Sequence, residues 1–219
     1  MGKSETELIR AVKVFQKVEG RSDFFALAEN ICKDHLIEAV IIILGTWNFA
    51  VFRYHLQKFD IKKTSKTLGN VQDILRPLKG KTIQSVDLEK HRAVIISAFN
   101  SLSAIKGIEF TGASKVLHLL NKDLFVMWDG YIRGEKSKRY YREIKTDISK
   151  YGKDGDSYLA FLKDMQIKYQ EVQWQGEMTL ARAIDAYNYV NVTIEIQKIE
   201  KRESEKKKAE KKALAEKEA

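Results

Sequence analysis

Residues 36–52, LIEAVIIILGTWNFAVF, are the one stretch of this 219-residue chain that is apolar enough to suggest a membrane segment. The stretch is short for a membrane-spanning helix, which needs about 20 apolar residues, and it contains Glu38 and Asn48. No second hydrophobic segment accompanies it. We therefore expect a buried helix that continues to about Phe59, in a protein with no membrane partner.

Glycine and proline are scarce, with twelve glycines and a single proline in the whole chain. Few positions suit the tight turns that join short strands, so long helices are favoured over a sheet. Ser4 and Glu7 have the spacing of a capping box at the start of a first helix. The sequence predicts an all-α helical bundle over residues 1–197, as a single domain or as two lobes at residues 1–82 and 83–197.

Residues 198–219, KIEKRESEKKKAEKKALAEKEA, carry nine basic and six acidic side chains and almost no large apolar ones. A segment of this composition has no face to bury, so we expect a charged, solvated tail, either helical or disordered. The net charge of the whole chain is +9 at pH 7. A surplus of this size favours a polyanion such as nucleic acid as a partner, and solubility alone is the alternative explanation.

Metal and disulfide chemistry are not expected in this chain. Cys32 is the single cysteine, and the four histidines have no ligand-like spacing. We therefore predict no metal site and no cofactor. The N-terminal sequence MGKSETELIR lacks the apolar core of a signal peptide, which favours a cytoplasmic location. The oligomeric state cannot be predicted from these features.

The segment most informative about chemistry is residues 108–133, IEFTGASKVLHLLNKDLFVMWDGYIR. Its pattern predicts a hairpin at residues 107–112, a short helix with Lys115 near its start, and then an apolar run that delivers Asp129 to the start of another helix. Apolar neighbours and the field of a helix start both disfavour the charged form of an amine, which makes Lys115 a candidate nucleophile. The alternative is that Asp129 only caps its helix and that Lys115 is an ordinary exposed lysine.

The run TGASKVLHLLNKDLFVMWDGYIR resembles the core of the helix-hairpin-helix DNA glycosylase superfamily, in particular its small 8-oxoguanine-glycosylase-like prokaryotic branch. In that superfamily a lysine closes the hairpin and an aspartate opens the next helix, and the matching residues here are Lys115 and Asp129. The hairpin of the superfamily usually reads as a Leu-Pro-Gly-Val-Gly type of turn, where this chain has IEFTGAS. The interval between the lysine and the aspartate is also shorter, by about one helical turn.

The resemblance implies a base-excision glycosylase with AP lyase activity on oxidised purines in double-stranded DNA. The damaged nucleotide would be flipped out of the duplex, Lys115 would form a Schiff base with the sugar, and Asp129 would offset charge in the transition state. Backbone groups at Gly112 and Ser114 would hold a DNA phosphate. The candidates for stacking on the flipped base are Trp128, Phe125 and Trp47.

Basic residues interleaved with tyrosines follow directly in YIRGEKSKRYYREIK. This mixture suits a phosphate backbone and exposed bases, whereas a solvated helix face is the simpler alternative. The predicted nucleic-acid contacts in this stretch are Arg133, Lys136, Lys138, Arg139 and Arg142. Two further hypotheses stay open: a non-enzymatic DNA-binding module on the same scaffold, and a helical interaction protein in which Lys115 and Asp129 are purely structural.

Overall fold

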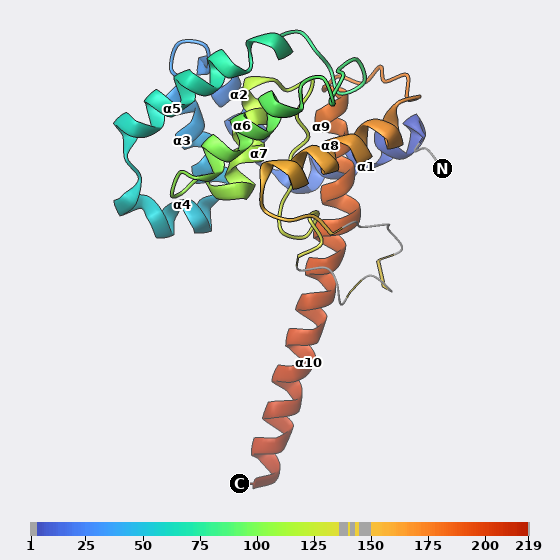
Figure 1. Cartoon of the computed structure of the whole chain (residues 1–219). Helices are drawn as coiled ribbons and strands as arrows, with labels where there is room; N and C mark the ends of the chain where they lie inside the picture. The colour runs from blue at the N-terminus through green and yellow to red at the C-terminus, as the bar shows by residue number, and fades with distance from the viewer. Residues whose placement is uncertain (1–3, 136–139, 141–142, 145–149, 219) are drawn as a thin grey trace.

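The computed structural model describes residues 4–135, 140, 143–144 and 150–218, with side chains as far as residue 210. Every regular element within these residues is a helix and none is a strand, so the predicted all-α class is confirmed. Figure 1 shows the helices gathered into one body, from which the last helix projects.

The first part of the chain is a series of helices joined by short turns. They are α1 (Glu5–Glu19), α2 (Ser22–Ile31), α3 (Leu36–Trp47), α4 (Phe49–His55), the 3-10 turn η1 (Leu56–Lys58), α5 (Ile61–Ile74) and the 3-10 turn η2 (Arg76–Leu78). The capping box is confirmed, because the Ser4 side chain accepts the N–H of Glu7 while the Glu7 carboxylate accepts the N–H of Ser4.

The prediction of one helix from residue 36 to about Phe59 is wrong. The chain bends by 115° between α3 and the segment formed by α4 and η1. Asn48 lies at this break, and its buried amide donates to the carbonyl oxygens of Gly107 and Ile108, at 3.1 Å each. An asparagine side chain competes for backbone partners and so disfavours a helix interior, and here that competition ties the corner to a distant turn.

Among the described residues, no single helix is both long enough and apolar enough to cross a membrane, and α3 reaches that length only together with the bent segment that follows it.

The second part of the chain supplies the remaining elements. They are α6 (Arg92–Ser103), α7 (Glu109–Leu120), α8 (Gly155–Tyr169), α9 (Leu180–Asn188), the π-helical turn η3 (Tyr189–Ile194) and α10 (Glu195–Glu218). Helix α6 packs against α7 and α8, and α9 packs against α1. The last helix predicted from sequence is therefore real but is interrupted by η3, where the hydrogen-bond pattern widens by one residue.

Helices α6 and α7 form the predicted helix pair, but the predicted hairpin at residues 107–112 has the wrong bounds. The turn lies at residues 104–108, where Gly107 has the left-handed φ of 93° that favours glycine. Gly112 lies inside α7, where an added Cβ would be 2.9 Å from Cδ2 of Leu44 and 3.0 Å from Nδ2 of Asn48. This glycine allows α7 to approach α3 closely instead of forming a turn.

One hydrophobic cluster runs through the body, with members from Leu8 to Tyr187. Both predicted lobes contribute to it, and how the chain divides into domains stays a prediction. A second, smaller cluster joins Tyr140 and Ile144 to Val192 and Ile196, where α10 begins.

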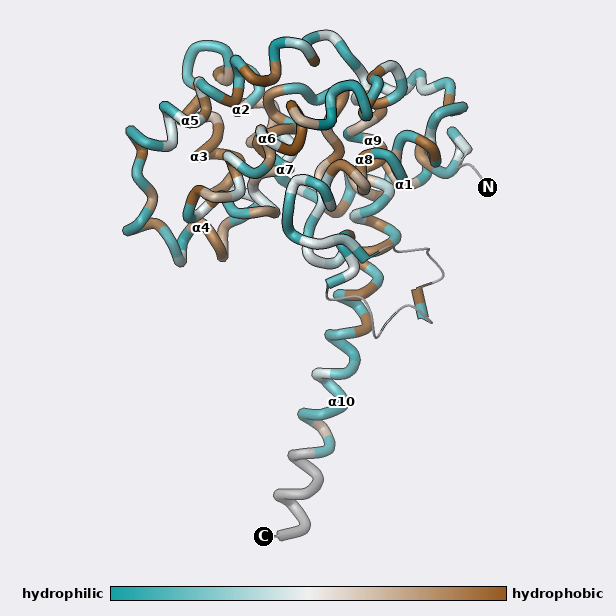
Figure 2. The backbone as a smooth tube through the Cα atoms, viewed as in Figure 1, coloured by the Kyte–Doolittle hydropathy of each residue, from teal (hydrophilic) through white to brown (hydrophobic). Residues whose placement is uncertain are grey.

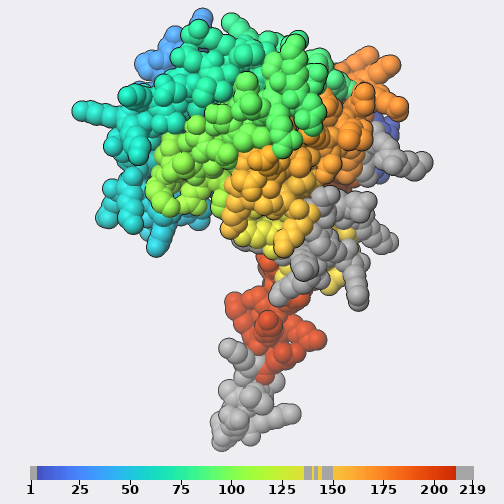
Figure 3. Space-filling model, viewed as in Figure 1, coloured from blue at the N-terminus to red at the C-terminus, as the bar shows by residue number. Residues whose placement is uncertain are grey.

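Helix α10 continues far beyond this second cluster. Figure 2 shows that its projecting part is hydrophilic, and the space-filling view in Figure 3 shows it standing clear of the body. Ion pairs one turn apart link Lys201 to Glu205 and Lys206 to Glu210, at 4.0 Å each. Exposed pairs of this kind contribute only about 0.3–0.5 kcal/mol each, so the helix gains little from them.

The packing at Gly112 gives a testable prediction for stability. Gly112→Ala is expected to lower the free energy of unfolding by about 1–3 kcal/mol, because the new methyl group overpacks the contact with α3. Gly69→Ala on the exposed surface of α5 is the matched control, since an added Cβ there meets nothing within 4 Å. The control should be neutral or stabilising by up to about 1 kcal/mol. Urea denaturation measures both, and equal effects would contradict the close approach of α7 to α3.

Candidate active site

Lys115 lies in the middle of α7 and not at its start. The eight residues from Gly112 to Leu119 are all buried, and only 8% of Lys115 is exposed. The part of the prediction that placed the amine in the field of a helix start is therefore wrong, because α7 begins at Glu109, six residues before Lys115. Packing of the helix, and not its dipole, removes this amine from water.

Asp129 follows the apolar run and holds the turn at residues 130–135. Its Oδ1 accepts the N–H groups of Tyr131 and Ile132, at 2.8 Å each, and its Oδ2 accepts the hydroxyl of Thr193 at 2.8 Å. The carbonyl of Asp129 also accepts the N–H of Arg133 at 3.0 Å. Asp129 thus caps a turn, with both carboxylate oxygens engaged, and the helix predicted to start at Asp129 is not formed over residues 130–135.

Lys115 and Asp129 line the same cavity, which has a volume of about 220 Å³. Other lining residues come from segments far apart in the sequence: Trp47, Arg182, Asp185, Tyr189 and Thr193. The cavity lies where the end of α3, the middle of α7 and the junction of α9 with η3 meet. Lys115 and Asp129, which were predicted to lie close together, therefore line one cavity, and Asp185 lines it as well.

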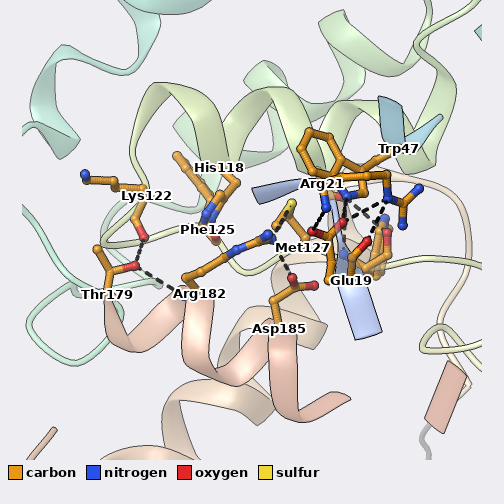
Figure 4. Close-up of polar contacts among 12 residues, drawn as sticks. Glu19, Arg21, Trp47, His118, Lys122, Phe125, Met127, Thr179, Arg182 and Asp185 are labelled. Carbon is orange, nitrogen blue, oxygen red and sulfur yellow. Dashed lines mark hydrogen bonds and ion pairs between the residues drawn. The ribbon is translucent and has the colours of Figure 1, made fainter. Parts of the chain in front are cut away.

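Asp185 and Arg182 form an ion pair on α9 beside this cavity. Nη1 of Arg182 donates to Oδ2 of Asp185 at 2.8 Å, and Figure 4 shows the guanidinium lying between Asp185 and Met127. The centre of the guanidinium is 5.0 Å from the ring of Phe15 and 4.8 Å from that of Phe25. Contacts with two aromatic rings and with the Asp185 carboxylate hold the guanidinium in place.

Electrostatics in the cavity favour a neutral amine. Burial lowers the pKa of Lys115, and the nearby carboxylates of Asp185 and Asp129 oppose that shift only in part. Burial also raises the pKa of Asp185, against the opposing charges of Arg182 and Lys115. Within the described residues, the amine of Lys115 has no hydrogen-bond or ion-pair partner. A lower pKa increases the fraction of the amine that carries a free lone pair, and this neutral form is the nucleophile.

The other wall of the cavity is a network at the end of α1. Glu19 accepts hydrogen bonds from Nε1 of Trp47 at 2.6 Å and from Nε of Arg21 at 3.0 Å, as Figure 4 shows. Arg21 in turn donates to the carbonyl of Thr46 at 3.1 Å. These bonds fix the indole of Trp47 at the cavity, so it is the base-stacking candidate that remains available.

The other two stacking candidates are in the core. Trp128 and Phe125 are both 0% exposed. The ring of Trp128 contacts Phe99, Tyr158 and Phe161, and its Nε1 donates to the carbonyl of Phe110 at 3.0 Å. Trp128 is nevertheless among the residues that line the cavity of Lys115, and Phe125 is not among them. Base stacking by either ring stays a prediction.

The predicted nucleic-acid contacts also need correction. Gly112 and Ser114 are buried inside α7, where the N–H of Gly112 donates to Ile108 and the hydroxyl of Ser114 donates to Thr111. Arg133 is 1% exposed, pairs with Glu135 and lies 4.3 Å from the ring of Phe110. These three predictions are wrong because the groups are used inside the fold. Four other predicted contacts lie outside the described residues: Lys136, Lys138, Arg139 and Arg142.

Several residues at the cavity were missed from sequence. Asp185 interrupts the apolar pattern of α9, between Ile184 and Ala186, and this buried carboxylate was the one detectable signal. Glu19 and Arg21 read as ordinary surface charges at a helix end. Their role depends on contact with the end of α3, which no local pattern reveals.

No group of three or more histidine, cysteine, aspartate or glutamate side chains in the described ranges is arranged to hold a metal ion.

The buried amine predicts a pH-dependent stability. Lys115 has a lower pKa in the folded protein than in the unfolded chain, where it is near about 10.4. Between these two values the unfolded chain binds more protons, so the free energy of unfolding of the wild type rises with pH. Lys115→Met removes the cost of deprotonating or burying this amine. The variant should therefore be more stable than the wild type at pH 7, and the difference in free energy of unfolding should shrink towards pH 10.

Urea denaturation from pH 7 to pH 10 measures this margin. Lys66→Met, at an exposed position of α5, is the control and should show a difference that does not change with pH. A margin for Lys115→Met that stays constant over this range would contradict the lowered pKa.

Comparisons of the chain with models of known families, with curated proteins and with solved structures found no match. What this cavity does must therefore be inferred from its own residues.

Proposed function

We propose that this protein is a DNA glycosylase with AP lyase activity on oxidised purines, in which Lys115 forms a Schiff base with the sugar. The observation that carries the proposal is the buried amine of Lys115, which has a lowered pKa and lies in one cavity with the carboxylates of Asp129 and Asp185. The resemblance of residues 108–133 to the glycosylase superfamily supplies the reaction class. The charge of +9 supports a polyanionic substrate.

The proposed reaction needs only the amine, the carboxylates and water. The lone pair of Nζ attacks C1′ of the flipped nucleotide, and the bond between C1′ and the base breaks, so that the base leaves with its electron pair and takes up a proton. Loss of a proton from Nζ and opening of the sugar ring at the C1′–O4′ bond give the C1′=N iminium. Removal of a C2′ proton then expels the 3′ phosphate oxygen and nicks the strand.

The carboxylates of Asp129 and Asp185 are suited to different steps of this reaction. Asp129 accepts three hydrogen bonds that hold its carboxylate in place at the cavity, so it is positioned to offset positive charge on the sugar. Asp185 accepts one hydrogen bond from Arg182 and has a raised pKa, which suits a group that takes up and returns protons. We therefore assign charge stabilisation to Asp129 and proton transfer to Asp185.

Borohydride trapping tests the proposal directly, because hydride reduces the iminium to a stable amine. The wild-type protein should form a covalent adduct with an oligonucleotide duplex that bears 8-oxoguanine or an abasic site. Lys115→Gln should form none, and Lys106→Gln, at an exposed position just before α7, should trap as the wild type does. No adduct of the wild type on 8-oxoguanine, uracil or an abasic site would contradict the proposal. Salt-sensitive duplex binding without an adduct would favour a non-enzymatic DNA-binding module.

A second set of variants distinguishes the roles of the two aspartates. Asp185→Asn is expected to slow single-turnover base release by about 10²-fold or more, the usual loss when a proton-transfer group is removed. Asp129→Asn keeps an Oδ1 that accepts the two N–H groups, so it should fold and bind duplex while losing turnover. Asp129→Ala should in addition lose about 0.5–2 kcal/mol of stability with the cap. Unfolding of Asp129→Asn, or full activity of Asp185→Asn, would contradict these roles.

A further inference from the structure

The corner at residues 49–66, formed by α4, η1 and the start of α5, exposes basic and apolar side chains together, and the proposed chemistry does not use it. Five basic residues of the corner are all exposed, against one acidic residue, Asp60: Arg53, Lys58, Lys62, Lys63 and Lys66. Large apolar or aromatic side chains are exposed as well, by 55% at Phe49, Leu56 and Ile61 and by 82% at Tyr54. Figure 1 shows this corner at an outer edge of the body.

The basic side chains of the corner are not neutralised within the fold. In the part of the chain that the structure describes, no carboxylate forms an ion pair with any of the five, and Oδ1 of Asp60 accepts the backbone N–H of Lys63 at 2.9 Å. Lys62 and Lys63 lie in the first turn of α5, where the helix dipole disfavours a cation, and this turn contains no acidic residue. Departures from a local rule of this kind are expected at functional sites.

The inner side of the corner is packed, so the charges are carried on a fixed frame. The ring of Phe52 contacts that of Phe59 edge to face, with 5.1 Å between their centres. Nε2 of His55 lies 3.1 Å from Oε1 of Glu109, the first residue of α7. The amide of Asn48 ties the start of α4 to the turn before α7. A partner of the corner therefore meets a surface that is already in place.

The order of side chains along α4 favours a nucleic acid over a lipid surface as that partner. The helical repeat puts Phe49, Arg53 and Leu56 on one face, and the guanidinium of Arg53 lies 5.9 Å from the ring of Phe49. A helix that lies on a bilayer keeps its cations on the opposite, polar face, whereas here a cation divides the apolar side chains. Basic residues mixed with aromatic ones suit nucleic acid. The corner also begins two residues after Trp47, which lines the cavity of Lys115.

We propose that the corner at residues 49–66 binds the phosphate backbone of duplex DNA, with its basic side chains on phosphates and its apolar side chains against the sugars between them. The inference rests on the proposed function for the identity of the polyanion. It places the backbone contacts on a surface different from Gly112, Ser114 and Arg133, which are buried. Contacts of this kind set affinity and salt dependence and not sequence preference.

The salt dependence of binding to an undamaged duplex tests the corner without any lesion or turnover. Each phosphate that a lysine neutralises contributes about 0.9 to the slope of log K against log salt concentration. A variant that combines Lys62→Gln, Lys63→Gln and Lys66→Gln should therefore show a slope that is shallower by about 2–3 than that of the wild type. Fluorescence anisotropy at a series of sodium chloride concentrations measures the slope. The variant should keep or raise its Tm, because two cations leave the first turn of α5.

The projecting part of α10 offers a control with the same change of charge. A variant that combines Lys206→Gln, Lys207→Gln and Lys208→Gln should keep the slope of the wild type. Equal changes of slope in the two triple variants, or an unchanged slope in the corner variant, would overturn the proposal. Binding of the wild type to vesicles of phosphatidylglycerol that the corner variant loses, with its duplex slope unchanged, would assign the corner to a lipid surface and overturn it as well.

Borohydride trapping separates this inference from the proposed function. An adduct of the wild type, together with an unchanged slope in the corner variant, would contradict the corner alone. A shallower slope in the corner variant, with no adduct of the wild type on any lesion, would support the corner and contradict the glycosylase.

Discussion

The amine of Lys115 is held inside a packed helix, where an ammonium ion loses most of its hydration and the surrounding groups must offset that loss. Every neighbour of Lys115 along α7, from Gly112 to Leu119, is buried. Gly112 permits this packing, because an added Cβ would lie 2.9 Å from Cδ2 of Leu44 and 3.0 Å from Nδ2 of Asn48 on α3 and at its end. The carboxylates of Asp185 and Asp129 compensate only partly for burial, so the pKa of Lys115 is lowered. The chemistry assigned to the cavity follows from that imbalance.

The cavity is assembled from segments that are distant in the sequence, and each has its own means of being held in place. The end of α1 and the end of α3 are joined through Glu19, which accepts from both Trp47 and Arg21. On the opposite side, α9 carries Asp185, and the π-helical turn η3 brings Thr193 to Asp129. π-Helical turns inside longer helices are frequently found at functional sites, because the extra residue redirects side chains. Here the hydroxyl of Thr193 donates to Oδ2 of Asp129, the oxygen that does not accept from the backbone.

The sequence predicted the helical class because so few glycines and prolines leave little room for strands. It paired Lys115 with Asp129 because both were expected at the starts of neighbouring helices. Both residues do reach one cavity. Other predictions failed for identifiable reasons. Gly112 resembled a turn residue but serves helix packing, and Arg133 resembled a DNA contact but is buried against Phe110. The proximity of Asp185 to Lys115 could not be predicted, because the sequence around a single buried carboxylate does not indicate which distant residues it meets.

The pKa of Lys115 is the quantity on which this account depends most directly, and it can be measured by NMR. Titration of the ¹³Cε and ¹⁵Nζ resonances of the lysines, with Lys115→Arg to assign the signal, would give each amine its own curve. We expect Lys115 to titrate clearly below the ordinary lysine value of about 10.4. A Lys115 that titrates together with the exposed lysines would contradict the account, because its amine would then be a solvated ammonium ion at neutral pH.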